Sequence, residues 1–306
     1  MPLTLVPLHP LFAAQATGVD LARPLSTAEI AAIDTAMDRY AVLVFRGQPP
    51  GQPPGQPLGQ PLGQPLGQTE QVAFARQFGP LDLGLKRLKK QPDRLAHEEL
   101  MDISNVEADG RPAARDSRKV VSNIANQLWH SDSSFQDPPG KYSMLSAVVL
   151  PDSGGETEFA DLRAAHDALE PALLREVATL SAEHDALHSR MLLGDNNYTP
   201  EQRAMLPAVS WPIVQTHPAG RKLLFIGVHA SRIVGMSMAE GRMLLADLLE
   251  HATQPRFVYR HHWRVGDLVM WDNRSTLHRG RRYDLSQPRE LRRTTTVERQ
   301  PALVAA

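Results

Sequence analysis

Apolar segments of strand length recur along the whole chain, and they place the strongest limit on how it can fold. Residues 41–45 and 142–150 are long enough for buried strands but too short for buried helices. The last third of the chain adds four more such segments, at 223–227, 257–263, 267–271 and 291–297. A chain with so many short apolar segments is expected to build its core from β-sheet.

Helical patterns lie between the predicted strands. Ser26 and Glu29 form a capping box ahead of apolar residues at helical spacing, and a second capping box precedes the strongest helical pattern, at 237–253. Residues 161–180 are also helical in pattern, with a proline restarting the helix part-way. Since no composition shift marks a boundary, the sequence predicts one α+β domain over residues 1–306.

A proline-rich repeat interrupts this pattern at residues 47–68. The tetrapeptide Gly-Gln-Pro, followed by Pro or Leu, recurs there with little apolar surface to bury. Proline fixes φ and removes a backbone donor, so such a segment favours an extended, solvated conformation. We therefore expect a surface loop that contains no chemistry.

The composition excludes several classes of function. Lys and Arg together number 33 and Asp and Glu 34, so the net charge is −1. A chain with this charge has no overall positive potential that would attract the phosphate backbone of a nucleic acid. The chain has no cysteine, which excludes zinc–thiolate sites, iron–sulfur clusters and thiol nucleophiles. It shows neither a signal peptide nor an apolar run long enough for a membrane span, so a cytoplasmic protein without a membrane partner is expected.

Two His-x-acid triplets are candidates for metal ligation. His97 and Glu99 lie in a helical pattern, where side chains two residues apart point about 200° apart, so this pair is interpreted as a solvated face. His130 and Asp132 lie in 128–135, whose alternation fits a strand, and on a strand both side chains point the same way. A strand-length segment at 267–271 leads towards a further histidine, His278. Two histidines and one carboxylate form the facial triad of non-heme Fe(II) oxygenases.

The spacing alone does not settle this site. Histidines of purely structural or surface role are the alternative interpretation. Other histidines could also supply the second imidazole, namely His217, His229, His261 and His262.

If the strand pattern extends over 289–297, Arg289, Leu291 and Arg293 fall on one face of it, and Arg292 falls on the other. Two inward arginines in a β core would be costly unless each meets an anion, and guanidinium groups pair readily with carboxylates. The alternative is a solvent-facing arginine ladder on an edge strand.

The motifs together resemble the taurine dioxygenase-like family of Fe(II)/2-oxoglutarate-dependent dioxygenases, over nearly the whole chain. The resemblance rests on Trp129-His130-Ser131-Asp132, Gly154-Gly155-Glu156-Thr157, Trp271-Asp272-Asn273-Arg274, His278-Arg279, and Arg289 with Arg293. It implies a double-stranded β-helix (jelly roll) with helices packed outside it. The main departure is the Gly-Gln-Pro repeat, which lies between elements and outside the motifs.

The resemblance also implies roles for individual residues. His130, Asp132 and His278 would bind Fe(II), while Thr157 and Arg289 would hold the distal carboxylate of 2-oxoglutarate. The roles implied on the substrate side are the acid-binding position for Arg293, a lining position for Asn126, and possible contacts for Arg87 and Arg111 in a closing segment at 85–111.

The implied activity is hydroxylation of the carbon next to the ether oxygen of an aryloxyacetate such as 2,4-dichlorophenoxyacetate, giving a phenol, glyoxylate, succinate and CO2. It requires Fe(II), 2-oxoglutarate and O2, with ascorbate as a further reductant, and its partner is a small acidic aromatic substrate. A homo-oligomer is expected. The alternatives are the same mechanism on a taurine-like sulfonate, an alkyl sulfate or an aryloxypropionate, and a non-redox jelly-roll protein with a structural metal.

Overall fold

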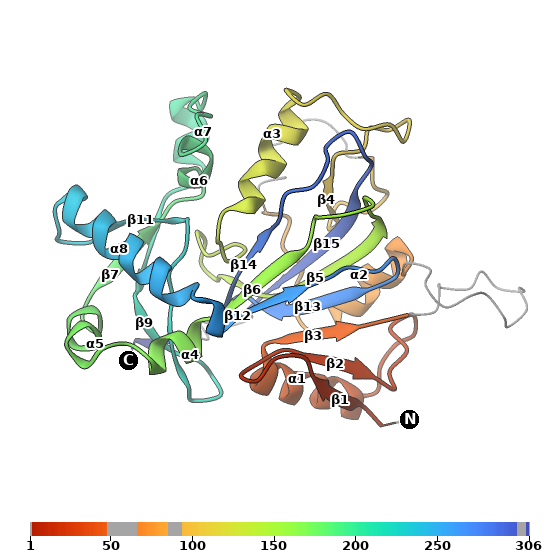
Figure 1. The fold of residues 1–306 in the computed structure, drawn as a ribbon, viewed down its shortest axis with the longest axis horizontal. Helices are drawn as coiled ribbons and strands as arrows, with labels where there is room; N and C mark the ends of the chain where they lie inside the picture. The colour runs from red at the N-terminus through yellow and green to blue at the C-terminus, as the bar shows by residue number, and fades with distance from the viewer. Residues whose placement is uncertain (1, 48–65, 85–93, 299–303, 306) are drawn as a thin grey trace, which may run out of the picture.

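A computed structural model describes residues 2–47, 66–84, 94–298, 304 and 305 (Figure 1). Within these residues, no helix is long and apolar enough to cross a membrane. The helical elements are α1 (Thr27–Tyr40), α2 (Gln68–Arg76), α3 (Arg118–Ile124), the 3-10 helix η2 (Ala125–Gln127), α4 (Leu162–Asp167), α5 (Pro171–Val177), α6 (His188–Met191), α7 (Pro200–Ala204), α8 (Met238–Ala252) and η3 (Pro255–Phe257).

The largest sheet has seven strands in the described part of the chain. Their order across the sheet is β1 (Thr4–Pro7), β2 (Ala14–Thr17), β3 (Val42–Phe45), β13 (Leu268–Asp272), β5 (Gly140–Val149), β15 (Glu290–Val297) and β4 (Met101–Ser104). Only the β2–β3 pair is parallel, and the other neighbours in this sheet are antiparallel. The sheet therefore brings the C-terminal strands β13 and β15 to either side of β5.

A second sheet of three antiparallel strands faces the first. Its order is β12 (Val258–His261), β6 (Thr157–Asp161) and β14 (Thr276–Gly280). The apolar sequence of β3 follows from this arrangement, because both of its faces are covered. Leu43 and Phe45 pack towards α1 and α2, whereas Val42 and Val44 pack in the cluster that includes Phe159 of the second sheet.

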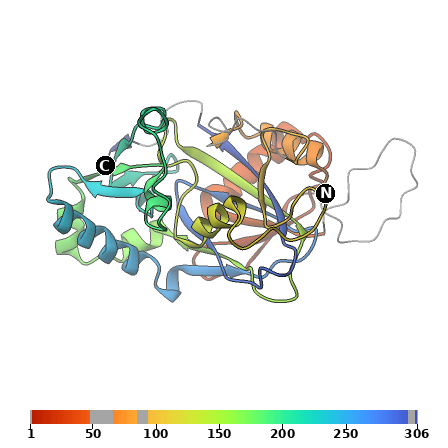
Figure 2. The same ribbon diagram turned by 90° about the horizontal axis from the view of Figure 1, so that it is seen from above.

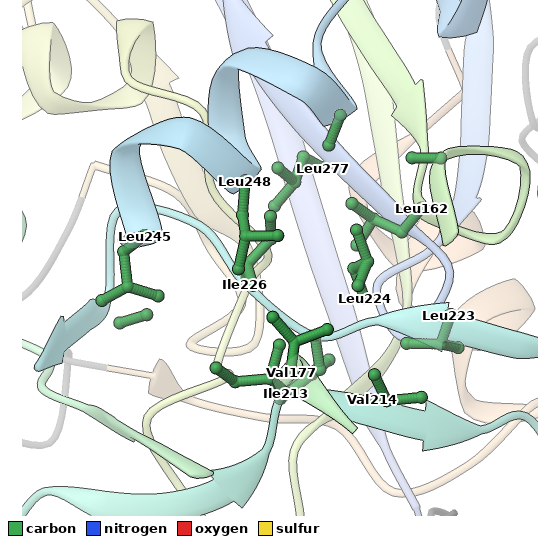
Figure 3. Packing of buried hydrophobic residues seen from close by; sticks show 14 of the residues in the cluster. Leu162, Val177, Ile213, Val214, Leu223, Leu224, Ile226, Leu245, Leu248 and Leu277 are labelled. Atoms are coloured by element: carbon green, nitrogen blue, oxygen red, sulfur yellow. The ribbon is translucent and has the colours of Figure 1, made fainter. Parts of the chain in front are cut away.

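The helices α4 to α8 and the remaining strands form a lobe beside the two sheets (Figures 1 and 2). It contains two small sheets, with strand orders β11 (Ala230–Ile233), β7 (Ser181–His184), β8 (Val209–Pro212) and β10 (Lys222–Leu224), β9 (Val214–Thr216), β16 (Val304–Ala305). Leu245 and Leu248 of α8 lie there in one buried apolar cluster with Ile213, Ile226 and Leu277 (Figure 3). Since Leu277 belongs to β14, this core also supports the strand that carries His278.

Most of the predicted elements are present, which confirms the α+β class. Ser26 caps α1 through the predicted capping box with Glu29. Ser237 caps α8 by accepting a hydrogen bond from the Glu240 backbone. The helical pattern at 161–180 is divided into α4 and α5, the second of which begins at Pro171 as expected.

The boundary predicted for the repeat was wrong at its C-terminal end. Residues 48–65 lie outside the described residues. Leu66, however, is only 1% exposed and belongs to the core cluster under α1 and α2, and Gln68 is the first residue of α2. The last leucine of the repeat is therefore buried by tertiary packing, although the composition of the repeat favours solvent exposure.

Candidate active site

Two histidines face each other where residues 128–135 run beside β14. The His130 backbone N–H donates to the His278 carbonyl at 3.0 Å, the His278 N–H donates back at 2.8 Å, and the ring centroids lie 4.1 Å apart. His130 Nδ1 lies 2.7 Å from the Leu128 carbonyl. Because a carbonyl can only accept, Nδ1 must carry the proton, and Nε2 is left with a free lone pair. Nε2 is buried and has no hydrogen-bond partner among the described residues.

Asp132 completes the group. Its Oδ1 lies 3.8 Å from His130 Nε2, and its Oδ2 lies 3.6 Å from His278 Nε2. One ligand atom from each of the three buried residues can be chosen so that all lie within 4.8 Å of one another. Burial lowers the pKa of both imidazoles, which favours the neutral form that metal ions require.

The predicted strand conformation of 128–135 was wrong, although the grouping of its side chains was not. Only His130 makes a β-bridge, and the chain then enters a turn in which Ser133 has φ +55°. The turn, rather than the strand alternation, returns Asp132 towards His130.

The structure groups His278 with His130 and Asp132, and none of the four alternative histidines belongs to this group. His217 and His261 contact Asp272 and Asp267 at 3.0 and 3.1 Å. The His262 side chain is 73% exposed. His229 is near, with its ring centroid 6.3 Å from that of His130, but it is outside the group of ligand atoms.

The alternation predicted for residues 289–297, most of which form β15, is confirmed. A pocket beside the three ligands is lined by Arg289, Leu291 and Arg293, together with Thr157 and Asn126. Arg292 instead pairs with Glu290 at 2.9 Å. The two arginines are therefore inward-facing, and the interpretation of a solvent-facing ladder is excluded.

Arg289 is a buried cation with free donor capacity. Its Nη2 donates to the Gly155 carbonyl at 2.9 Å and its guanidinium lies 5.2 Å from the Tyr283 ring centroid, but its Nε has no partner among the described residues. Burial lowers its pKa to about 10. Gly155 has φ +73°, and a Cβ at this position would lie 2.8 Å from Arg289 Nε, so glycine is needed for this close approach.

Thr157, the first residue of β6, is 3% exposed, and its Oγ1 accepts a hydrogen bond from Trp263 Nε1 at 3.0 Å. Since the indole nitrogen can only donate, the threonine hydroxyl proton remains available to an acceptor in the pocket. Arg289 and Thr157 can together bind an anionic group.

Arg293 has a contact that the sequence did not predict. Its Nη1 lies 2.5 Å from Asp132 Oδ1, and its Nε has no partner among the described residues. Arg293 therefore contacts the carboxylate of Asp132, a candidate metal ligand, and also lines the pocket.

A family model described as taurine catabolism dioxygenase TauD, TfdA family, matches residues 4–295, which is most of the chain. The chain belongs to this family. The enzyme class predicted from the sequence, a dioxygenase, is thereby confirmed.

Several known proteins are similar to this chain over nearly its full length. The alpha-ketoglutarate-dependent 2,4-dichlorophenoxyacetate dioxygenase of Cupriavidus pinatubonensis is 57% identical, covering 95% of this chain and 96% of that protein. The (S)-phenoxypropionate/alpha-ketoglutarate-dioxygenase of Sphingobium herbicidovorans is 36% identical over 93% and 91% of the two chains. The crystal structure of AAD-2 in complex with Mn(II) and N-oxalylglycine matches with TM-score 0.86 and 45% identity, covering 98% of this chain and 99% of the other.

The structure places the three other residues predicted on the substrate side differently. Asn126, in η2, lines the pocket. The Arg111 side chain is 84% exposed and pairs with Asp109 at 2.7 Å, so the structure does not bring it to the pocket. Arg87 lies outside the described residues.

Sequence reasoning missed several residues of this TauD/TfdA site. Tyr283, Trp263 and Ser143 contact the side chains of Arg289, Thr157 and Asp132, respectively, and Asn273 accepts a hydrogen bond from the Asp132 backbone N–H. Of these, only Asn273 lies within a recognised motif, immediately after Asp272. Ser143 had no signal, because a lone serine in a strand indicates nothing about a partner more than ten residues away.

Proposed function

We propose that this protein is an Fe(II)/2-oxoglutarate-dependent dioxygenase that hydroxylates the carbon next to the ether oxygen of aryloxyacetates such as 2,4-dichlorophenoxyacetate. The observation that carries the proposal is a His-Asp-His group beside two inward-facing arginines in one pocket. The 57% identity to 2,4-dichlorophenoxyacetate dioxygenases supports this substrate class.

The residues fit an iron ion. His130 offers an unpartnered, unprotonated Nε2, His278 a neutral imidazole, and Asp132 a carboxylate, which is the two-nitrogen, one-oxygen donor set of non-heme iron oxygenases. The chemistry supplied by bound iron and 2-oxoglutarate is the decarboxylation of 2-oxoglutarate by O2 to succinate and CO2, coupled to hydroxylation of the substrate.

The protein's own residues bind and orient the two organic acids. Arg289 and the Thr157 hydroxyl bind the distal carboxylate of 2-oxoglutarate, because both offer free donors in a buried position. Arg293 binds the substrate carboxylate, next to Asp132, and Asn126 lines the substrate side. The hydroxylated substrate is a hemiacetal, which collapses to a phenol and glyoxylate.

The fold belongs to the same proposal. We infer that the seven-stranded sheet and the β12–β6–β14 sheet are the two layers of a double-stranded β-helix, with helices packed outside, and that residues 1–306 form one catalytic domain. Their shared apolar cluster, which joins β3, β5 and β13 to Phe159 of β6, supports this inference. Assembly into a homo-oligomer stays a prediction.

The proposal is tested by product analysis. The enzyme would be supplied with Fe(II), 2-oxoglutarate, O2 and ascorbate, and succinate and phenol would be measured with 2,4-dichlorophenoxyacetate, both enantiomers of an aryloxypropionate, an alkyl sulfate and taurine. We expect stoichiometric succinate and phenol with the aryloxyacetate. Succinate formation that depends on taurine or the alkyl sulfate alone would contradict the substrate class, and its absence with every compound would contradict the enzyme activity.

A further inference from the structure

The carboxylate of Asp132 is held from two opposite sides. Arg293 Nη1 lies 2.5 Å from Oδ1, and Ser143 Oγ donates to Oδ2 at 2.7 Å. Oδ2 is the oxygen nearer to His278. Arg293 and a bound metal ion would compete for the Asp132 carboxylate. The orientation of the carboxylate is therefore set by Ser143, which holds Oδ2, the oxygen that Arg293 does not contact.

Ser143 is saturated with hydrogen bonds. It lies on β5 and is fully buried, and its Oγ contacts Asp132, Asn273 Nδ2 at 2.9 Å and Thr295 Oγ1 at 2.9 Å. The serine proton goes to the carboxylate, and the amide nitrogen can only donate. Thr295 must therefore donate as well, so one serine oxygen makes one donor and two acceptor bonds. This arrangement permits a single orientation of the hydroxyl group.

Asn273 is the centre of the same network. Its Oδ1 accepts from the Asp132 backbone N–H at 3.1 Å and from Trp271 Nε1 at 3.0 Å, and its carbonyl accepts from Ser131 Oγ at 2.5 Å. Two N–H donors fix the amide oxygen, which leaves the amide nitrogen facing Ser143. The turn that carries Asp132 is therefore tied to the end of β13 through one fully buried side chain.

Three neighbouring strands contribute to this network. In the large sheet Ser143 of β5 is paired in register with Trp271 of β13 and with Thr295 of β15, so the side chains of all three point to the same face. That face is the one towards the metal ligands, because Trp271 lines the same pocket as His130 and His278. The network is thus built into the strand register.

We propose that Ser143 and Asn273 are positioning residues that hold Asp132 in the orientation that binds the metal, against the attraction of Arg293. This inference rests on the proposed metal site. Without Ser143, Asp132 would retain Arg293 as its side-chain partner among the contacts described, and its carboxylate would turn towards that guanidinium.

The test is metal binding by the apo-protein, with metal ions alone as the probe. Mn(II) or Co(II) affinity would be measured by calorimetry for the wild type, Ser143→Ala and Ser146→Ala, together with the visible absorption of the Co(II) form. Ser146 is the matched control: it is also on β5 and 1% exposed, but its hydroxyl has no partner among the described residues. Ser143→Ala is expected to lower the affinity about 10- to 100-fold and to alter the Co(II) spectrum, because loss of an outer-shell partner of a ligand typically has this effect. Ser146→Ala should match the wild type.

Thermal unfolding of the apo-proteins is measured in parallel, so that a lower metal affinity is attributed to the position of Asp132 only where the variant stays folded. If Ser143→Ala binds Co(II) as tightly as Ser146→Ala, with an unchanged spectrum, the inference is overturned while the metal site itself stands. If the wild type does not bind either metal, the proposed function fails first. Should Ser143→Ala be too unstable to titrate, Thr295→Val decides, since it removes only the donor to Ser143. A severalfold weaker affinity supports the inference, and an unchanged affinity overturns it.

Discussion

Arg289 and Arg293 should fail in different ways when truncated to alanine. Each would form a charge-assisted pair with a carboxylate in a largely desolvated position: Arg289 is 7% exposed, and the Arg293 side chain is 15% exposed. Truncating one partner of such a pair costs on the order of 2–5 kcal/mol. At about 1.4 kcal/mol per tenfold change in affinity, this corresponds to a loss of roughly 30-fold to a few thousand-fold.

The loss should fall on different ligands. Arg289→Ala should raise the 2-oxoglutarate concentration needed for half-maximal rate, with little effect on the aryloxyacetate requirement. Arg293→Ala should do the reverse and should still consume 2-oxoglutarate slowly without substrate hydroxylation, because Ser143 continues to hold Asp132 after the ion pair is lost. The assay is a pair of titrations for each variant, one for each ligand at a saturating level of the other, following succinate and phenol separately.

Arg292→Ala is the internal control. Its side chain points away from the pocket and pairs with Glu290, and Glu290 keeps a second partner in Arg94 at 2.9 Å. Both titrations should therefore resemble the wild type. If Arg292→Ala showed the substrate defect and Arg293→Ala were silent, the orientation of β15 assumed for the site would be refuted.

Three further predictions concern the metal ligands, the repeat and pH. His130→Ala, Asp132→Ala and His278→Ala should each abolish Fe(II)-dependent turnover, because two remaining ligands hold the ion too weakly; more than a few percent of residual activity would remove that residue from the triad. Deleting four tetrapeptides between residues 48 and 65 should leave the melting temperature and turnover nearly unchanged, since loop closure entropy grows slowly with length; a large loss of either would show that the repeat packs on the domain. Burial lowers the pKa of His184 from 6.5 to about 4, so the unfolded chain binds more protons between these values and stability should fall as pH drops through this window. Melting curves of His184→Phe across that range should show a weaker pH dependence, and an equally steep dependence would exclude His184 as a contributor.

Much of this architecture could be predicted from local pattern. β3 and β13 are continuous apolar runs because both of their faces are buried, and α1 is marked by its capping box. These signals lie within a few residues of the elements they specify. The inward direction of Arg289 and Arg293 followed in the same way, from the period of two along a strand.

The errors came from contacts between residues far apart in sequence. Residues 128–135 alternate as a strand would, yet Asn273, more than 140 residues away, accepts from the Asp132 backbone and helps to hold a turn instead. Leu66 is buried by elements that come from other parts of the chain, although its own repeat is poor in apolar residues. In each case, the residues that determine the local structure lie outside the segment from which the prediction was made.

The charges of the site bear on its substrates. Arg281 lines the pocket and lies 3.7 Å from Glu158, but that carboxylate also contacts Arg260 at 2.5 Å and Arg279 at 2.8 Å, whereas Arg293 is paired with Asp132. Arg289 forms no ion pair among the described residues and burial favours the neutral form of the histidines, so with a divalent metal ion at least three positive charges would lack an ion-pair partner in a largely buried space. Uncompensated buried charge is costly. Dianionic 2-oxoglutarate and a monoanionic aryloxyacetate together bring three negative charges to this excess, whereas zwitterionic taurine in place of the aryloxyacetate adds no net charge to the two of 2-oxoglutarate. The charge balance of the pocket therefore favours the aryloxyacetate over the zwitterionic sulfonate, on grounds independent of sequence similarity.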